Sequence, residues 1–216
     1  MLKYRRVINN LSNVPFFDTV TVQQLLGVSK KATYENINRW IKQGRLIQLK
    51  KGLYTTQEYY KTLNNKQVYL EFLANNLRVP SYLSLEYVLQ KYSILTEQVF
   101  AYTSITLKTK RMYTNALGTF IYRQISLKLF AGFKQLNIDG FTIYQATKAK
   151  ALFDYLYLKF LNYQVINTQN IIDLRLNLDQ VTKTDLQELA KYCRLAQISK
   201  FKNLPNLIKL VQNANV

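Results

Sequence analysis

Residues 19–55 contain a helix, a glycine, a second helix and a hairpin in direct succession, and this order restricts the fold more than any other feature. Apolar residues at helical spacing predict a first helix over Val20–Leu26, which ends at Gly27. Ser29 is a good N-cap, because its hydroxyl can accept a hydrogen bond from a free amide of the first turn. A second helix is therefore predicted from there to about Gln43.

The stretch QGRLIQLKKGLY then predicts a hairpin, with strands over 46–49 and 53–55 joined by a turn over 50–52. Two helices joined by a glycine turn and followed by a hairpin are typical of a winged helix-turn-helix. The turn carries Lys50 and Lys51, and the natural use of such charge at a hairpin tip is contact with a phosphate backbone.

The second helix has two different faces. At about 100° per residue, Thr33, Ile37, Trp40 and Ile41 fall on the apolar face, and the opposite face is basic and polar. Such a face is often only solvated surface, but the ordered set of elements favours DNA binding. Glu35 could accept from a cytosine amino group, repel phosphate, or pair with a basic residue one turn away. The predicted DNA contacts are Ser29, Lys30, Lys31, Tyr34, Asn38, Arg39, Lys42, Arg45, Lys50 and Lys51.

Composition supports a polyanionic partner. The 216 residues include 30 basic and 12 acidic ones, a net charge of +18 with a pI near 9.9. One cysteine and no histidine exclude an internal disulfide, an ordinary zinc site and Ser–His or Cys–His nucleophiles, and no cofactor is expected. No apolar run is long enough to span a membrane, and no signal peptide is recognised, so a cytoplasmic location without membrane contact is expected.

Polar residues 56–66 are the predicted boundary between a winged helix-turn-helix domain over 1–60 and an α+β domain over 67–216. Asp139–Gly140 is a typical hairpin turn. Ser81 or Ser84 could cap a helix that begins after Pro80. The expected helices of the second domain are 68–77, 81–92 and 148–160, and the expected strands are 99–106, 109–115, 117–125 and 141–147.

Two further helices are expected near the C-terminus. Thr184 and Gln187 have the spacing of a capping box, and Cys193 shares one face of that helix with leucines, which indicates a core thiol. Asn203 and Pro205 suit the start of a last helix, with Leu207, Ile208 and Val211 inward.

Several ordered blocks resemble the AbiEi-type antitoxin family of abortive-infection, type IV toxin–antitoxin systems. They are the segments PSYLSLEYVLQKYSILTEQVFAYTSIT, LGTFIYRQI and ATKAKALFDYLYL, together with GVSKKATYENINRWIKQGRLIQLKKGLY. The resemblance covers roughly residues 15–160, and its most specific parts are residues 84–86 and 151–154. It implies a winged-helix domain followed by an α+β antitoxin domain. The missing nucleophile systems lead us to expect no enzymatic activity.

The resemblance further implies a repressor that binds double-stranded DNA at repeats in the promoter of its own operon. It also implies a role in phage defence, opposing a nucleotidyltransferase-like toxin without requiring a stable complex. Relatives commonly have Thr-Pro-Glu-Lys before the apolar helix, whereas this chain has Thr147 followed by Lys148, Ala149 and Lys150.

Lys148 and Lys150 would stand in the first turn of that helix, where cations are disfavoured. Either both side chains reach water, or an anion such as a DNA phosphate binds there. Residues 61–150 contain 12 basic and 4 acidic residues, which fits a second DNA or anion site.

Two other functions compete with a DNA-binding antitoxin. A metal-dependent nuclease with a winged-helix head would need clustered carboxylates and a lysine, and only Glu86, Asp139, Asp154 and Lys150 are candidates in the second domain. A nonspecific basic partner protein would bind all DNA alike. No metal site is predicted.

Overall fold

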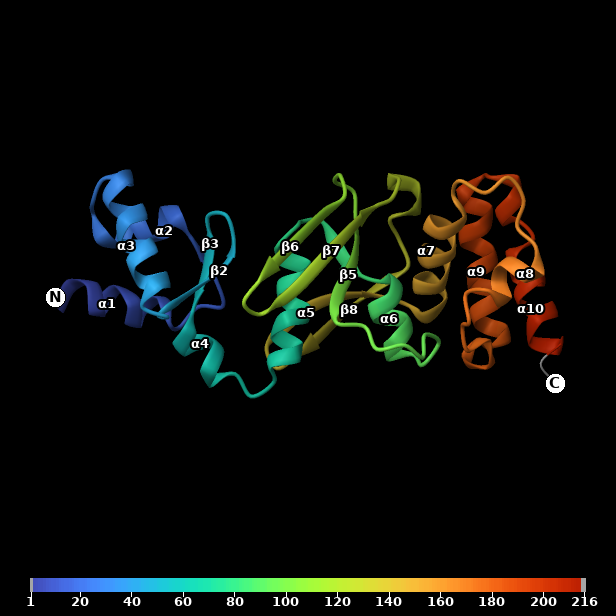
Figure 1. Cartoon of the computed structure of the whole chain (residues 1–216), viewed down its shortest axis with the longest axis horizontal. Helices are drawn as coiled ribbons and strands as arrows, with labels where there is room; N and C mark the ends of the chain where they lie inside the picture. Colours follow the sequence, from blue (N-terminus) through green and yellow to red (C-terminus); the bar gives the residue numbers. More distant parts are fainter. Residues whose placement is uncertain (1, 215–216) are drawn as a thin grey trace. The chain divides into compact units, whose positions relative to one another are not determined.

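The computed structural model describes residues 2–214, and its chain is a mixture of helices and strands, which confirms the α+β class. Two compact units result, one formed by Met1–Leu70 with Tyr113–Thr119 and the other by Glu71–Met112 with Phe120–Val216. The division falls within helix α5 (Lys66–Asn76), so each unit is described separately (Figure 1).

The first unit combines helices with a small antiparallel sheet in the order β1-β3-β2. Its core contains the apolar sides of the first three helices, with Trp40 and Ile37 almost fully enclosed. Its elements are α1 (Leu2–Leu11), β1 (Phe17–Asp18), α2 (Thr19–Leu26), α3 (Lys30–Lys42), β2 (Leu46–Lys50), β3 (Leu53–Thr56) and α4 (Gln57–Thr62). The two helices and the hairpin predicted over residues 19–55 are therefore confirmed.

The second unit contains a six-stranded sheet in the order β6-β7-β5-β4-β9-β8. Strand β4 runs antiparallel to β5 but parallel to β9, where Leu83 pairs with Gln145. The strands are β4 (Ser81–Leu83), β5 (Ala101–Thr106), β6 (Arg111–Asn115), β7 (Gly118–Gln124), β8 (Phe133–Ile138) and β9 (Phe141–Ala146). Asp139 and Gly140, both at positive φ, form the predicted turn between the last two strands.

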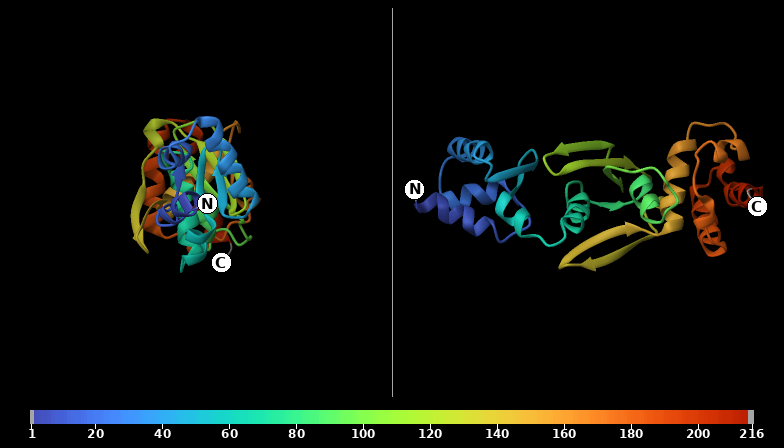
Figure 2. Two further views of the ribbon diagram at one scale, coloured as in Figure 1. Left: turned by 90° about the vertical axis from the view of Figure 1, so that its left-hand side faces the viewer. Right: turned by 60° about the horizontal axis from the view of Figure 1, so that its bottom comes forward.

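The C-terminal half of α5 lies between the two hairpins of this sheet (Figure 2). Tyr122 of β7 donates its hydroxyl to the Ala74 carbonyl at 2.7 Å. The Asn75 amide pairs with both backbone groups of Tyr144, accepting from the N–H at 2.6 Å and donating to the C=O at 3.2 Å. The Asn75 side chain therefore ties α5 to the backbone of β9, next to Gln145, the residue that pairs with β4.

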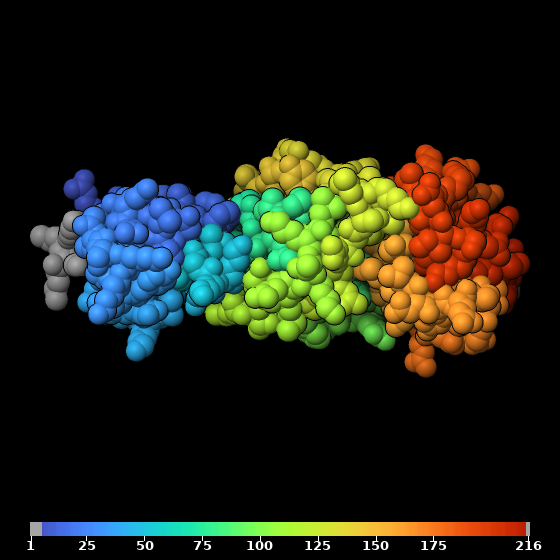
Figure 3. All heavy atoms as spheres, turned by 90° about the horizontal axis from the view of Figure 1, so that it is seen from above, coloured from blue at the N-terminus to red at the C-terminus, as the bar shows by residue number. Residues whose placement is uncertain are grey.

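The remaining helices are α6 (Leu85–Lys91), α7 (Lys148–Phe160), α8 (Thr168–Ile172), α9 (Lys183–Ala196) and α10 (Leu204–Ala214). Helix α7 lies between the sheet and the last three helices (Figure 1). Helix α10 packs against both α8 and α9 in the orange and red part of the chain (Figure 3). Cys193 is buried there as predicted, and burial raises the pKa of its thiol to about 12.

Three local expectations were wrong. Residues 81–83 were expected to begin a helix, but they form strand β4 because β5 and β9 on either side offer backbone partners. The helix that follows, α6, has no side-chain cap from Ser84. Strand β8 was missed. The capping box of α9 is Thr182 with Asp185, two residues earlier than expected, because Thr182 accepts from the Asp185 amide at 3.2 Å.

Candidate nucleic-acid interface

Three local features fix the start of α2, its end and the start of α3. Asp18 caps α2 by accepting from the Thr21 amide at 2.8 Å, and it also accepts from the Thr21 hydroxyl. These two hydrogen bonds lower the pKa of the Asp18 carboxyl. Gly27 ends α2 in the left-handed conformation, at φ 62°. Ser29 then caps α3 by accepting from the Ala32 amide at 3.3 Å. Because Gly27 and Ser29 act only on adjacent backbone groups, the sequence was sufficient to predict the turn between α2 and α3.

Helix α3 buries one side and exposes the other. Thr33, Ile37 and Trp40 are buried, and Ile41 packs half-buried against the same core. Most of the predicted contact residues are exposed: Ser29, Lys30, Lys31, Tyr34, Asn38, Arg39, Lys42, Arg45 and Lys51. The structure thus places the basic and polar side of α3 in solvent, where a polyanion could reach it.

The hairpin after α3 turns at Gly52, whose φ is +79°. The register shifts between Gln48 and Lys50, so the strand is irregular just before the tip. Lys50 is half-buried, with its ammonium 5.9 Å from the centroid of the Tyr113 ring in the same unit. Lys51 is exposed and is therefore the more accessible of the two tip lysines.

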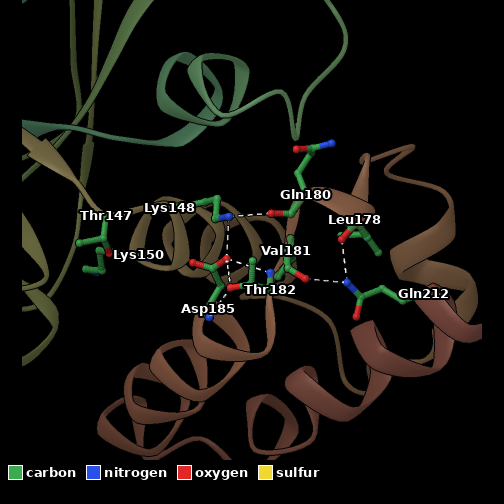
Figure 4. A network of polar contacts seen from close by, with 9 residues as sticks. All are labelled: Thr147, Lys148, Lys150, Leu178, Gln180, Val181, Thr182, Asp185 and Gln212. Carbon is green, nitrogen blue, oxygen red and sulfur yellow. Dashed lines mark hydrogen bonds and ion pairs between the residues drawn. The ribbon is translucent and has the colours of Figure 1, made fainter.

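The second predicted anion site has a different environment from the one expected. The Lys148 ammonium lies 2.7 Å from an Asp185 carboxylate oxygen and donates to the Gln180 carbonyl at 2.6 Å (Figure 4). Burial of Asp185 opposes its ionisation, but hydrogen bonds from Lys148 and Thr182 outweigh this and lower the pKa of its carboxyl. The positive charge at this helix end is thus neutralised from within the protein.

Lys150 is fully buried and forms an ion pair with Asp154, one turn later on α7. Its ammonium also lies 4.9 Å from the ring centroid of Phe153 and 5.1 Å from that of Tyr192. Both lysines therefore have protein partners, and the hypothesis of a DNA phosphate at this helix end loses its basis. The correction follows from tertiary packing, which encloses Lys150 on all sides.

Asp154 is the centre of a buried polar network. Its carboxylate accepts from the hydroxyls of Ser84 at 2.8 Å and Tyr82 at 3.0 Å, both from outside α7. Burial raises the pKa of the Asp154 carboxyl, and the Lys150 ammonium and these hydroxyls oppose that rise. A carboxylate so enclosed stabilises the packing of α7 but is closed to solvent and substrate.

The other carboxylates proposed for a nuclease do not join Asp154. Asp139 lies in the turn between β8 and β9, and Glu86 lies in the first turn of α6. Within residues 2–214, no group of three His, Cys, Asp or Glu side chains could hold a metal ion. In the same part of the chain, no helix is long and apolar enough to cross a membrane.

These observations define the class: an α+β protein whose N-terminal unit exposes a basic helix and a hairpin with a charged tip. Residues 5–57 match the family model described as transcriptional regulator, AbiEi antitoxin, which confirms the resemblance over that segment. The resembling blocks at residues 84–86 and 151–154 lie outside the match. No curated protein matches the chain.

Proposed function

We propose that the chain is a sequence-specific DNA-binding antitoxin whose N-terminal residues act as a winged helix-turn-helix. Helix α3 would lie in the major groove and the β2–β3 hairpin would contact the phosphate backbone as a wing. In this proposal residues 1–60 bind DNA and residues 67–216 form the antitoxin domain. The protein represses its own operon and counteracts a nucleotidyltransferase-like toxin, in defence against phage.

The observation that carries the proposal is the exposed side of α3. Helix and cap position Lys31, Asn38 and Arg39 on the solvent side, while Trp40 anchors the opposite side in the core. Arginine and asparagine are the side chains that most often read guanine and adenine in the major groove. The match of residues 5–57 to a transcriptional-regulator family supports the same conclusion.

The first prediction tests base reading by α3. Replacing Lys31 or Asn38 by alanine is expected to weaken binding to the DNA upstream of the chain's own gene by about 1–3 kcal/mol each. Binding to random DNA of equal length should weaken less, because groove contacts carry the specificity. Fluorescence anisotropy with both DNAs measures the difference, and Lys209→Ala, an exposed charge on α10, is the control.

The same variants should release repression of a reporter driven by that upstream DNA, while cells remain protected from the toxin gene. Equal losses on both DNAs would show that α3 does not read bases. Loss of protection together with repression would instead indicate a misfolded protein.

The second prediction concerns the wing. Replacing Lys50 and Lys51 by alanine is expected to lower affinity for every DNA sequence. It should also reduce the slope of log affinity against log salt by roughly one unit for each phosphate contact removed. Lys51→Ala should account for most of the change, because Lys51 is exposed whereas Lys50 is half-buried. A salt slope equal to that of the unmodified protein would contradict a wing contact.

A further inference from the structure

Asn36 is an unusual residue on the buried side of α3. Its neighbours on that side are Thr33, Ile37 and Trp40. Asn36 is buried like them, at 7% exposure, although its side chain is a polar amide. A buried amide without hydrogen bonds would destabilise the fold, because it loses its hydrogen bonds to water and gains none in the protein. The partners of this amide therefore indicate why the position is not apolar.

The two ends of the Asn36 side chain have different partners. Its Nδ2 donates to the Ala32 carbonyl at 2.7 Å, within the helix. Its Oδ1 accepts from Nη2 of Arg39, one turn further along. The second contact joins a buried amide to the side chain of Arg39, an exposed residue, so a core residue restrains a side chain at the surface.

Restraint matters for an arginine at this place. A free arginine side chain loses conformational entropy when it is fixed, and anchoring it beforehand reduces that loss on binding. The planar guanidinium matches a pair of acceptors, which in DNA is either the O6 and N7 edge of guanine or a phosphate. Orientation is required for the guanine edge and is much less important for a phosphate, which can be approached from many directions.

We infer that Asn36 is a positioning residue, which acts through Arg39 to orient the guanidinium toward a guanine in the major groove. The inference rests on the proposed DNA-binding function and names one of its specificity determinants. The competing explanation is that Asn36 serves only the helix, through its bond to Ala32.

The test is a double-mutant cycle on the full chain with Asn36→Ala, Arg39→Ala and both together. Sites selected from a random DNA library by the unmodified protein should contain a guanine whose preference disappears with Arg39→Ala. Asn36→Ala alone should reduce that preference on the order of tenfold. In the Arg39→Ala background the same change should alter it less than about twofold, because the guanidinium is already absent.

A conservative variant separates the two contacts of Asn36. Asn36→Asp retains an acceptor for Arg39 but removes the donor to Ala32, so the guanine preference should persist even if total affinity falls. Loss of the preference with Asn36→Asp, or equal effects of Asn36→Ala in both backgrounds, would overturn the inference in favour of a helix-only role. Equal weakening on all sequences, with a reduced salt slope, would assign Arg39 to a phosphate and also overturn it.

A measurement without DNA distinguishes failure of this inference from failure of the proposed function. The Nε–Hε group of Arg39 should be ordered in nitrogen-15 relaxation of the unmodified protein and mobile in Asn36→Ala. An equally mobile group in both would overturn the positioning role. Absence of any sequence preference in the unmodified protein would instead refute the DNA-binding proposal itself.

Discussion

Asp154→Ala is expected to lower the free energy of unfolding by about 3–5 kcal/mol, because it leaves the Lys150 ammonium buried without its counter-charge. The change also removes the acceptor for the hydroxyls of Tyr82 and Ser84. Chemical denaturation of the full chain, followed by circular dichroism, measures the loss. Asp185→Ala removes the carboxylate of the partly exposed pair with Lys148. It should lower the free energy of unfolding less, by a total of about 1–2 kcal/mol.

A double variant identifies the cause of this loss. Lys150→Met with Asp154→Asn removes both charges but leaves an amide oxygen that can accept from Tyr82 and Ser84. It should therefore be more stable than Asp154→Ala, since an apolar residue in place of a buried ion often has little net effect once its partner is also neutral. If the double variant is as unstable as Asp154→Ala, the shape of the site rather than its charge determines the stability.

Gly132→Ala is the second change with a large expected effect, a loss of about 2–5 kcal/mol in the free energy of unfolding. Gly132 has φ +78°, which strains any residue with a Cβ. The added carbon would lie 2.6 Å from Cζ of Tyr192 and 3.0 Å from Cγ of Lys150. To relieve this clash Tyr192 would have to move, and its hydrogen bond from the hydroxyl to Glu188, at 2.8 Å, opposes that movement.

Gly140→Ala provides a matched control. Its φ is +79°, almost the same as that of Gly132, but nothing lies within 4 Å of the added carbon. Only backbone strain should remain, which is about 1–2 kcal/mol. The difference between the two variants in thermal or chemical denaturation measures the close packing around Tyr192, and equal losses would refute that packing effect.

Much of the N-terminal unit could be predicted because its signals lie within a few residues of one another. The cap at Ser29, the left-handed glycine at Gly27 and the turn at Gly52 each act on adjacent backbone groups. The exposed side of α3 followed from the same reasoning, because the apolar period of the helix identifies its buried side. Asn36 was missed because it does not lie on the polar face of α3, although an amide among apolar neighbours is a visible signal.

The second unit was less predictable because its contacts join distant parts of the chain. Residues 81–83 have the composition of a helix start, but pairing with β5 and β9 makes them a strand. From the sequence, Lys150 was expected to reach water or to bind an anion at a helix end, and only the folded chain shows that it is enclosed with Asp154. Cations in the first turn of a helix do need a compensating anion. Here the anions belong to the protein itself: Asp185 pairs with Lys148, and Asp154 pairs with Lys150.

The sequence alone thus determined the two helices and the hairpin of residues 19–55, the cap at Ser29 and the excess of positive charge, since these depend on neighbouring residues and on composition. Tertiary structure decided which charges remain available to a partner. Burial and ion pairing depend on groups such as Tyr82 and Asp154, which are 72 positions apart. No local pattern encodes such a distance, because the energy of burying a charge depends on everything packed around it.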